Sequence, residues 1–529
     1  MAQTDPERKL LRILHYGSEE ACYIPGCRLQ AKFYSEERVN QLRTLIAEIE
    51  QTVLFETIRK VIRNKTSLFP ELILYVLAEC ARSENLRPEA LNVAEELCTT
   101  PKLFLLFFKF AKGLSPHIGT GRACRRFISN WYLNKDSLEL AEMVGQTPCY
   151  RGWRHSDLIK IAHVKTVDPG KGAVLTYCAK GLKAMLTKFG DNTKAKEVVS
   201  YLQHVDNFRR DGDQTSVIRT IESYMLTIHH LNFSHLKNKQ VWIALLRRMP
   251  VDTLMDYLHL LCKYRMFRKG RQWDQEFLTA VCDVLSNFNS VVQSRIQPSR
   301  VYINLCEYQS APKFKLELAA KSHKRLAQKP PAVSFELVQN LQSLINLSYR
   351  NVAPTGLRFV ISVDNTDMAK RRCSHILYMM ANQAAAAIAT TFFVSEDQCD
   401  VVLCHSPPTR VELNSKDIKM QDVADKLIAT DKSNAKGSRN IFGGLKWAVD
   451  NKKEVDVFII IGCSLKFQGI ANKLAEYRSK LIVPNFKLIL CTICGLSKQP
   501  IIDDMNVFTI VGFDANVCNV ISRFATGAF

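Results

Sequence analysis

The sequence contains no apolar run long enough to cross a membrane. Its longest apolar stretches, LFLLFF (103–108) and VFIII (457–461), are far shorter than the roughly 20 residues that a membrane helix needs. The start of the chain also lacks the basic and apolar parts of a secretory signal, because Asp5 and Glu7 stand where that signal would begin. We therefore expect a soluble intracellular chain with no membrane partner.

The sequence also lacks the short motifs that mark common catalytic sites. It has no GxSxG elbow, no P-loop, no HExxH pair and no GxGxxG after a strand. His405 and Asp400 stand near a predicted strand end, but no nucleophile at a turn accompanies them. We therefore expect a protein that is not an enzyme.

Cysteine is plentiful but lacks the spacing of a disulfide framework or a zinc site. The 17 cysteines are scattered singly through apolar segments, which favours reduced thiols in a core. The one CxxC pair, Cys491 and Cys494, stands in a strand-like run with no second pair and no nearby histidine. We expect no metal or redox role for that pair.

Acidic residues are scarce in one part of the chain, and the net charge of +21 comes mainly from there. Residues 101–350 hold 38 Lys and Arg against 19 Asp and Glu, whereas residues 1–100 hold 13 against 15 and residues 351–529 hold 21 against 17. A concentrated block of positive charge predicts a polyanionic partner, and nucleic acid suits it better than a membrane.

Two patterns of apolar residues divide the chain. From about residue 37 to 350 apolar positions recur at helical spacing, with breaks that often contain proline or glycine, and no strand pattern is evident. This pattern predicts an α-solenoid of stacked helix pairs. Residues 311–333 are polar and basic and indicate a linker or exposed loop before one further helix.

After Pro354 apolar runs of strand length alternate with helix-like segments, which predicts a parallel α/β sheet covered on both faces. Ligands of such sheets gather at the carboxyl ends of the strands. RFVISVD (358–364) ends in Asp364, followed by Asn365, Thr366 and Asp367, so oxygen ligands for a divalent cation are expected at that edge.

Two segments of the basic block suit nucleic acid. In YRGWRHSDLIKIAHVKT (150–166), Ser156 could cap a helix with an apolar stripe of Leu158, Ile161 and Ala162, leaving Lys160 and His163 on an exposed face. Basic groups there would contact phosphates, and His and Trp rings could stack on bases. A second segment, KYRMFRKGRQW (263–273), interleaves basic and aromatic residues, as single-strand binders do. Both could instead be solvated helix faces or loops with buried aromatics.

Six segments, in this order, resemble the Ro autoantigen family, which are ring-forming RNA-binding proteins with a TROVE module followed by a von Willebrand factor A-like domain. The resemblance runs almost end to end. It is carried by LRILHYGSE (11–19), GRACRRFISNWY (121–132), GWRHSDLIKIAHVK (152–165), HLKNKQVWIALLRRMP (235–250), RIQPSRVYINLCEY (295–308) and PTGLRFVISVD (354–364).

The resemblance implies a ring of HEAT-like helix pairs at 1–353, closed by an α/β doubly wound parallel-sheet domain at 354–529. In that family the outer basic surface holds Y RNA, and the central hole admits the 3′ ends of misfolded small RNAs, such as 5S ribosomal RNA precursors. His163 matches a family RNA-binding histidine, whereas two other basic positions fall on Gln146 and Tyr150, beside Arg151. The candidate RNA-binding residues are His163, Lys160, Arg151, Arg154, Lys165, Arg122, Arg125, Arg126, Lys237, Arg265, Arg268, Lys269 and Arg271.

The family's A domain also carries a metal-ion-dependent adhesion site, which is degenerate in this sequence. The first element is Asp364, Thr366 and Met368, so a thioether replaces a hydroxyl, while the loop threonine corresponds to Ser438 and a later aspartate to Cys463. Asp367 or Ser464 could compensate. A divalent cation such as Mg²⁺ is the only cofactor that the resemblance implies, and we expect the site to be vacant.

The resemblance implies a monomeric component of a ribonucleoprotein that captures small noncoding RNAs for quality control, and we expect it to be cytoplasmic with access to the nucleus. The alternative is a protein-interaction scaffold, since helical solenoids and A domains both bind proteins. Replacing Lys160 and His163 discriminates the two, because RNA capture would fall and a scaffold would tolerate the change.

Overall fold

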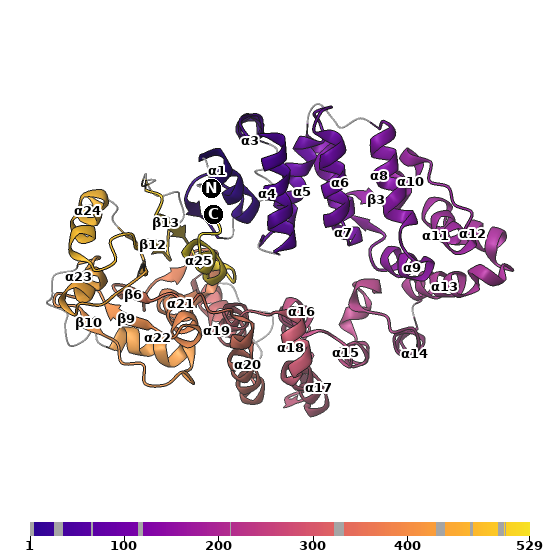
Figure 1. Cartoon of the computed structure of the whole chain (residues 1–529). Coiled ribbons are helices and arrows are strands. Elements are labelled where there is room, and N and C mark those ends of the chain that lie inside the picture. The colour runs from indigo at the N-terminus through magenta and orange to yellow at the C-terminus, as the bar shows by residue number, and fades with distance from the viewer. Residues whose placement is uncertain are drawn as a thin grey trace. The chain divides into compact units, whose positions relative to one another are not determined.

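The computed structural model describes residues 5–25, 35–64, 67–114, 120–211, 213–321, 333–429, 440–465, 469–495, 502 and 504–529, with side chains throughout except at 313–321. The chain divides into two compact units (Figure 1). The helical unit comprises Met1–Glu19 and Arg28–Arg247, and the sheet unit comprises Glu20–Cys27 and Arg248–Phe529. Among the described residues, no helix is long and apolar enough to span a bilayer.

The helical unit is a series of short helices in which elements two apart pack together, such as α5 with α7, α6 with α8, α9 with α11 and α11 with α13. This arrangement confirms the predicted solenoid of stacked helix pairs. Its elements are α1 (Asp5–Tyr16), α3 (Glu36–Glu48), α4 (Gln51–Arg63), α5 (Pro70–Cys80), α6 (Arg87–Leu97), α7 (Pro101–Gly113), α8 (Arg122–Leu133), α9 (Ser137–Gln146), β2 (Cys149–Tyr150), β3 (Trp153–Arg154), α10 (His155–Ala162), α11 (Pro169–Lys180), α12 (Leu182–Phe189), η1 (Thr193–Ala195), α13 (Lys196–Arg210), α14 (Gln214–Tyr224), η2 (Ile228–His230), η3 (His235–Lys237) and α15 (Lys239–Leu246).

Proline marks the start of several helices, as the sequence breaks predict. Pro70, Pro101 and Pro169 occupy the first turns of α5, α7 and α11. A proline fits there because the first backbone N–H groups of a helix have no partner within it. Side-chain oxygens complete two of these starts, since Thr100 accepts from the N–H of Leu103 and Asp168 from that of Lys171.

An aromatic cluster joins α7 to α8 in the core of the helical unit. The ring of Phe104 is stacked on Trp131, with centroids 4.3 Å apart and planes 4° apart. The edges of Phe108, Phe127 and Tyr132 meet the same ring at 5.3 to 5.8 Å. All five side chains are buried, so the cluster fixes the inner face of α8.

The sheet unit contains further helices and the seven-stranded sheet. Its elements are β1 (Cys22–Tyr23), α16 (Val251–Lys263), β4 (Arg268–Lys269), β5 (Gln272–Trp273), α17 (Gln275–Ser286), α18 (Phe288–Ser294), α19 (Pro298–Lys321), α20 (Phe335–Ser348), η4 (Tyr349–Asn351), β6 (Phe359–Asp364), β7 (Arg372–Cys373), β8 (Ile376–Met380), α21 (Ala381–Ser395), β9 (Cys399–Leu403), β10 (Thr409–Arg410), α22 (Met420–Ala429), α23 (Gly443–Asp450), β11 (Val457–Gly462), α24 (Ile470–Lys480), β12 (Lys487–Thr492), β13 (Val507–Val511) and α25 (Val517–Ala525).

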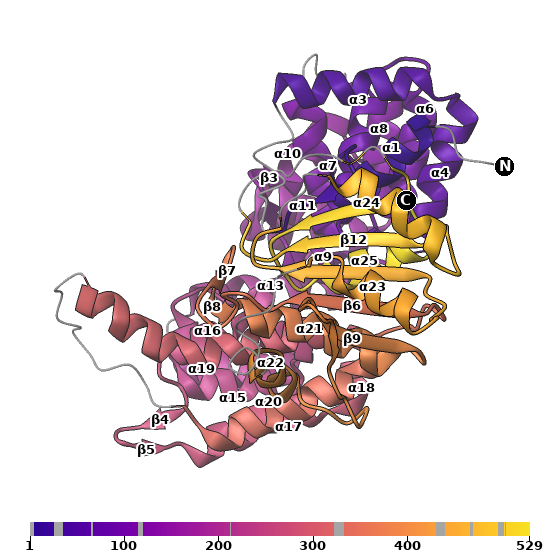
Figure 2. The same cartoon turned by 90° about the vertical axis from the view of Figure 1, so that its left-hand side faces the viewer.

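The sheet has the order β1-β13-β12-β11-β6-β9-β10 and is parallel except for β10. Figure 2 labels β12, β6 and β9 of this sheet. One face packs on α21 and α25, where Phe359 stacks on Phe392 and Phe508 on Phe524. The other face packs on α23 and α24. The chain leaves β6 towards β9 and later returns to the other side of β6 as β11, so the order reverses between β6 and β11. The predicted α/β sheet covered on both faces is confirmed, and this reversal marks where such sheets bind ligands.

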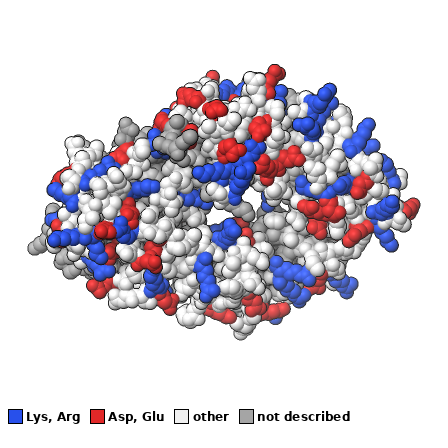
Figure 3. Space-filling model, in the orientation of Figure 1, with Lys and Arg blue, Asp and Glu red and all other residues white. Residues whose placement is uncertain are grey.

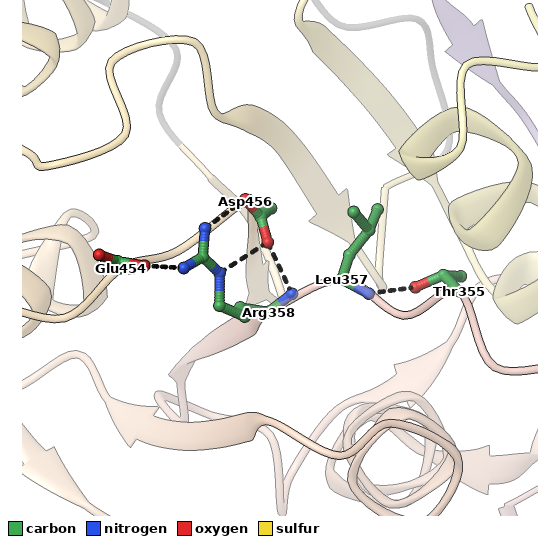
Figure 4. Close-up of polar contacts among 5 residues, drawn as sticks. All are labelled: Thr355, Leu357, Arg358, Glu454 and Asp456. Carbon is green, nitrogen blue, oxygen red and sulfur yellow. Dashed lines mark hydrogen bonds and ion pairs between the residues drawn. The ribbon is translucent and has the colours of Figure 1, made fainter.

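Ion pairs fix the entrances of β6 and β11 (Figure 4). The carboxylate of Asp456 accepts from the backbone N–H, Nε and Nη2 of Arg358, each at 2.9 Å, and Arg358 also pairs with Glu454. The bonds from Arg358 hold the pKa of Asp456 below its usual value. They help to set the register that places Asp364 opposite Gly462 at the far end of the two strands.

Two local predictions are wrong. Residues 311–321, predicted as part of a linker, continue helix α19, since the residues after Pro312 are mostly good helix formers; residues 322–332 of that linker lie outside the described residues. The helical region also contains strands, because β2 with β3 and β4 with β5 form short hairpins. Two-residue strands are too short for an alternating pattern to reveal.

Candidate nucleic-acid interface

Helix α8 presents a basic face opposite its buried stripe. Cys124, Phe127, Ile128 and Trp131 are buried, as the sequence pattern predicts. The predicted basic residues Arg122, Arg125 and Arg126 are all exposed, and Nε of Arg125 donates to the carbonyl of Thr120 at 2.9 Å. Helix α8 packs on α10, so its basic face belongs to the same part of the helical unit as the α10 segment.

The hairpin of β2 and β3 displays two further arginines. Its turn residues are Arg151 and Gly152, with φ of 52° and 89°, which is the backbone that a two-residue hairpin turn requires. The Arg151 guanidinium lies 5.6 Å from the ring centroid of Tyr150, and its positive charge acts on the half-buried carboxyl of Glu71. Trp153 is anchored beside Phe108 of α7. Arg151 and Arg154 are exposed, so the hairpin holds both cations towards solvent.

Helix α10 starts earlier than the sequence predicts. Ser156 is not the N-cap, because the helix begins at His155 and Arg154 occupies the cap position. The carboxylate of Asp157 accepts the backbone N–H of Arg154 at 3.0 Å, which is the return bond of a capping box. The hairpin leads directly into the helix, and this junction replaces the serine cap.

The end of α10 carries the residues predicted to face solvent. Lys160 and His163 are both exposed. His163 closes the helix in the left-handed conformation, with φ of 50°, and its N–H donates to the carbonyl of Ile159. Lys165 follows and is also exposed. Of the predicted apolar stripe, Leu158 is buried, whereas Ile161 and Ala162 are only half-buried.

His155 is buried and cannot stack on a base, contrary to the sequence prediction. Its Nε2 lies 3.0 Å from the carbonyl of Thr147, which can only accept, so Nε2 carries the proton. Its Nδ1 lies 2.7 Å from the hydroxyl of Tyr132, which therefore donates. The ring also stacks on Trp131 at 5.8 Å. His155 thus joins α10 to α8 as a neutral imidazole.

The helical unit is expected to lose stability between pH 7.5 and pH 5. Burial lowers the pKa of His155 and that of His230 to about 4, whereas a histidine in the unfolded chain titrates near 6.5. The unfolded state therefore binds more protons as the pH falls through this window, and His155 alone removes about 2 kcal/mol of stability by pH 5. Native-state hydrogen exchange of α8 and α10 amides at the two pH values measures the loss.

His155→Gln is the control for that prediction. A glutamine amide can donate to Thr147 and accept from Tyr132 but does not titrate. Its stability should vary less between pH 7.5 and 5 than that of the wild type. Equal pH dependence in both chains would show that His155 does not stay neutral in the fold.

The acidic side chains of the 122–165 segment leave its cations unpaired. Eight Lys and Arg stand there against four Asp and Glu; Asp136 caps α9, and Asp157 accepts the return bond at the start of α10. Figure 3 shows acidic and basic groups mixed over much of the face presented, with basic groups over α8 and α10. Within the described residues, no carboxylate forms an ion pair with the members of what we call the basic surface: Arg122, Arg125, Arg126, Arg151, Arg154, Lys160, His163 and Lys165.

The remaining predicted residues lie elsewhere. Lys237 is exposed in η3 of the helical unit. The other four, which belong to the sheet unit, lie on or just before the β4–β5 hairpin: Arg265, Arg268, Lys269 and Arg271.

The aromatics of this hairpin are not free to stack on bases. Phe267 is buried against Phe277, with ring centroids 5.5 Å apart. Trp273 is half-buried beneath the Arg268 guanidinium, 4.1 Å from its ring centroid. This hairpin could therefore contact a nucleic acid through its cations rather than through its aromatic rings.

Gln146 and Tyr150 occupy two positions where the resemblance implies basic residues. Gln146 ends α9 and Tyr150 lies in β2, and both are half-buried. Neither can supply a charge, and the nearest cation is Arg151 at the adjoining turn. Sequence reasoning missed this hairpin, although the Arg-Gly pair between Tyr150 and Trp153 is a recognisable turn signal.

Asp364 and Thr366 stand at the carboxyl end of β6, as predicted. Oδ1 of Asp364 accepts the backbone N–H of Thr366 at 3.1 Å. Met368, in the place of a hydroxyl, is fully buried, and Nδ2 of Asn365 donates to the carbonyl of Leu427 at 2.9 Å. Asn365 therefore fastens the loop to α22.

The members of the implied metal site that the structure describes do not complete a ligand set. Ser438 lies outside the described residues. Cys463 is buried with its thiol hydrogen-bonded to that of Cys494, Asp367 pairs with Lys370 at 3.6 Å, and Ser464 is exposed. The residues that the structure describes contain no group of three His, Cys, Asp or Glu side chains placed to hold a metal ion. The sulfur atoms of Met368 and Cys463 stand where a hard cation needs oxygen, so the described residues of this site do not fit such an ion.

Comparisons with known proteins give matches that extend over both units. The model of the Ro60 vWA domain matches residues 358–525. The RNA-binding protein RO60 of Caenorhabditis elegans is 21% identical over 493 residues, covering 84% of this chain and 73% of that protein. The RNA-binding protein RO60 of Deinococcus radiodurans is 22% identical over 466 residues, covering 86% and 81%. The crystal structure of the Deinococcus radiodurans RO (RSR) protein superposes with a TM-score of 0.79 at 19% identity, over 99% of this chain and 100% of that one.

Proposed function

Because the chain belongs to the Ro60 family, we propose that it binds RNA and that the basic surface holds the phosphate backbone. The relatives are named RNA-binding proteins. The observation that carries the proposal for this chain is a set of exposed cations on α8, the β2–β3 hairpin and α10 that form no ion pair with a carboxylate among the described residues. Such cations can neutralise the phosphates of a nucleic acid, and the release of the counterions held there favours binding.

The basic surface suits backbone contact more than base recognition. Its guanidinium and ammonium groups are exposed, while the rings of Trp131, Tyr132 and His155 are buried. His163 is the one exposed imidazole among its members and could stack on an unpaired base or contact a phosphate. We therefore propose that RNA is selected by its shape and its unpaired ends.

We further propose that the RNA is a small noncoding RNA held within a ribonucleoprotein by a single copy of the chain. The candidates are a Y-like RNA and the 3′ ends of misfolded small RNAs, and the role is RNA quality control without catalysis. Gln146 and Tyr150 favour the misfolded RNA, because they lack charge where a Y RNA surface would need it. Sequencing RNA crosslinked to the chain in cells identifies the class. Recovery of mRNA alone would contradict this assignment.

Binding is expected to weaken by about a hundredfold between 50 and 200 mM KCl for a small structured RNA with a single-stranded 3′ tail. About five neutralised phosphates, each contributing about 0.7 to the slope of log affinity against log salt, give a slope near 3.5. Fluorescence anisotropy of the labelled RNA over a KCl series measures it. An affinity that does not change with salt would exclude the basic surface as the contact.

We also propose that the sheet unit acts without a bound cation and that the protein is cytoplasmic with access to the nucleus. The support for the first is the donor set, because Met368 and Cys463 offer sulfur where a hard cation needs oxygen. A saturable Mg²⁺ site in isothermal titration calorimetry would overturn it. Fractionation that finds the chain only in a membrane or secreted fraction would overturn the second.

A further inference from the structure

Two cysteine thiols meet at the carboxyl edge of the sheet. Cys463 follows β11, and Cys494 lies two residues beyond β12. These strands pair in parallel, with Gly462 opposite Thr492 as their last pair. The N–H of Cys494 donates to the carbonyl of Cys463 at 3.2 Å, and the two thiols are hydrogen-bonded to each other.

The pair is a cross-strand pair, distinct from the CxxC of the sequence. Cys491, the other member of that motif, is fully buried within β12. Cys494 lies after the strand, beside Cys463. All three cysteines are free. The CxxC spacing therefore gives no indication of which thiols are neighbours.

The separation of the two residues suits a disulfide. Neighbouring strands lie about 4.8 Å apart, and disulfides bridge Cα atoms about 4.4 to 6.8 Å apart. The bond between the backbones of Cys463 and Cys494 shows that the chains are still adjacent at this point. Little backbone movement is needed to join sulfurs that are already hydrogen-bonded.

The two thiols differ in access to solvent. Cys463 is 5% exposed, whereas Cys494 is only partly buried. The hydrogen bond from Cys463 and the charge of the exposed Arg371 lower the pKa of Cys494, which favours the thiolate that reacts with oxidants. An oxidant would therefore meet Cys494 first, with Cys463 behind it as the resolving thiol.

We propose that Cys463 and Cys494 form a reversible disulfide when the chain encounters a peroxide. The Cys494 thiolate attacks one oxygen of hydrogen peroxide; an S–O bond forms, the O–O bond breaks, and the departing hydroxide takes a proton to become water. The Cys463 sulfur then attacks the Cys494 sulfur. The S–S bond forms, the S–O bond breaks, and the Cys463 proton leaves with that oxygen as a second water. The thiols lose two electrons and the peroxide gains them.

The test is oxidation of the full chain with a small excess of hydrogen peroxide, followed by thiol blocking, trypsin digestion and mass spectrometry. We expect a peptide pair joined through Cys463 and Cys494 that dithiothreitol separates. Cys491→Ser is the matched control and should give the same linked pair in the same yield. Cys494→Ser should give none.

A second variant traps the intermediate. In Cys463→Ser the resolving thiol is absent, so a dimedone adduct on Cys494 should accumulate to at least about tenfold the wild-type amount if the sulfenic acid precedes the disulfide. A Cys491–Cys494 disulfide in the wild type, or oxidation of Cys494 to sulfinic acid with no link to Cys463, would overturn the proposal. The wild-type peptide map shows whether Cys463 and Cys494 are linked, even where a variant fails to fold.

Discussion

A chain carrying Arg122→Gln, Arg126→Gln and Lys160→Gln is expected to bind a small structured RNA about ten- to hundredfold more weakly than the wild type at 150 mM KCl. Each lost phosphate contact lowers the slope of log affinity against log salt by about 0.7. Three lost contacts therefore lower the slope by about 2, and the loss of the same contacts weakens the electrostatic part of the affinity. These three side chains are exposed on α8 and α10, so the fold should be unaffected. Anisotropy titrations at several KCl concentrations measure both quantities.

The matched control removes the same charge elsewhere in the helical unit. Lys60, Arg63 and Lys194 are exposed, and none belongs to the basic surface. Replacing these three by glutamine should change the affinity less than about threefold and leave most of the slope, since only weak long-range attraction is lost. Equal losses from both triple variants would mean that net charge, and no particular surface, governs binding.

Phe104→Ala is expected to lower the free energy of unfolding of the helical unit by about 3 to 5 kcal/mol, as for other buried aromatics truncated to alanine. The ring is fully buried, stacked on Trp131 and met by the edges of three other rings. Its removal leaves a cavity and weakens the packing of α8 on α7. Native-state hydrogen exchange of amides in α7 and α8 reports the loss directly.

The same variant tests whether the aromatic cluster supports the basic surface. Trp131 and Tyr132 both contact His155 at the start of α10, so loosening α8 should loosen α10 and weaken RNA binding as well. Phe233→Ala is the control, because that side chain is 69% exposed and its loss should cost less than about 0.5 kcal/mol. A change below about 1 kcal/mol in Phe104→Ala would show that the cluster does not hold the two helices together.

The fold could be predicted from the sequence where strong local signals agree. Prolines at 70, 101 and 169 mark helix starts, because proline is tolerated best in the first turn of a helix. The continuous apolar runs before Asp364 and Gly462 predict buried parallel strands, since both faces of such a sheet are covered. The polar and basic composition of residues 311–333 misled the prediction of a linker, because the helix-forming residues after Pro312 continue α19 to Lys321.

The candidate site could be predicted only in part. The basic face of α8 and the exposure of Lys160 and His163 follow from helical spacing. The burial of His155 does not, because its partners, Thr147 and Tyr132, come from other elements and only the tertiary structure brings them together. The pairing of Cys463 with Cys494 was missed for the same reason: 31 positions separate the two, and the sheet places them side by side.

Ultraviolet crosslinking of the full chain to a labelled small RNA, with the crosslinked peptides identified by mass spectrometry, tests the central claim most directly. The account predicts nucleotide adducts on peptides between Arg122 and Lys165, concentrated at the β2–β3 hairpin and the end of α10. Adducts confined to peptides outside that segment, with none within it, would contradict the account.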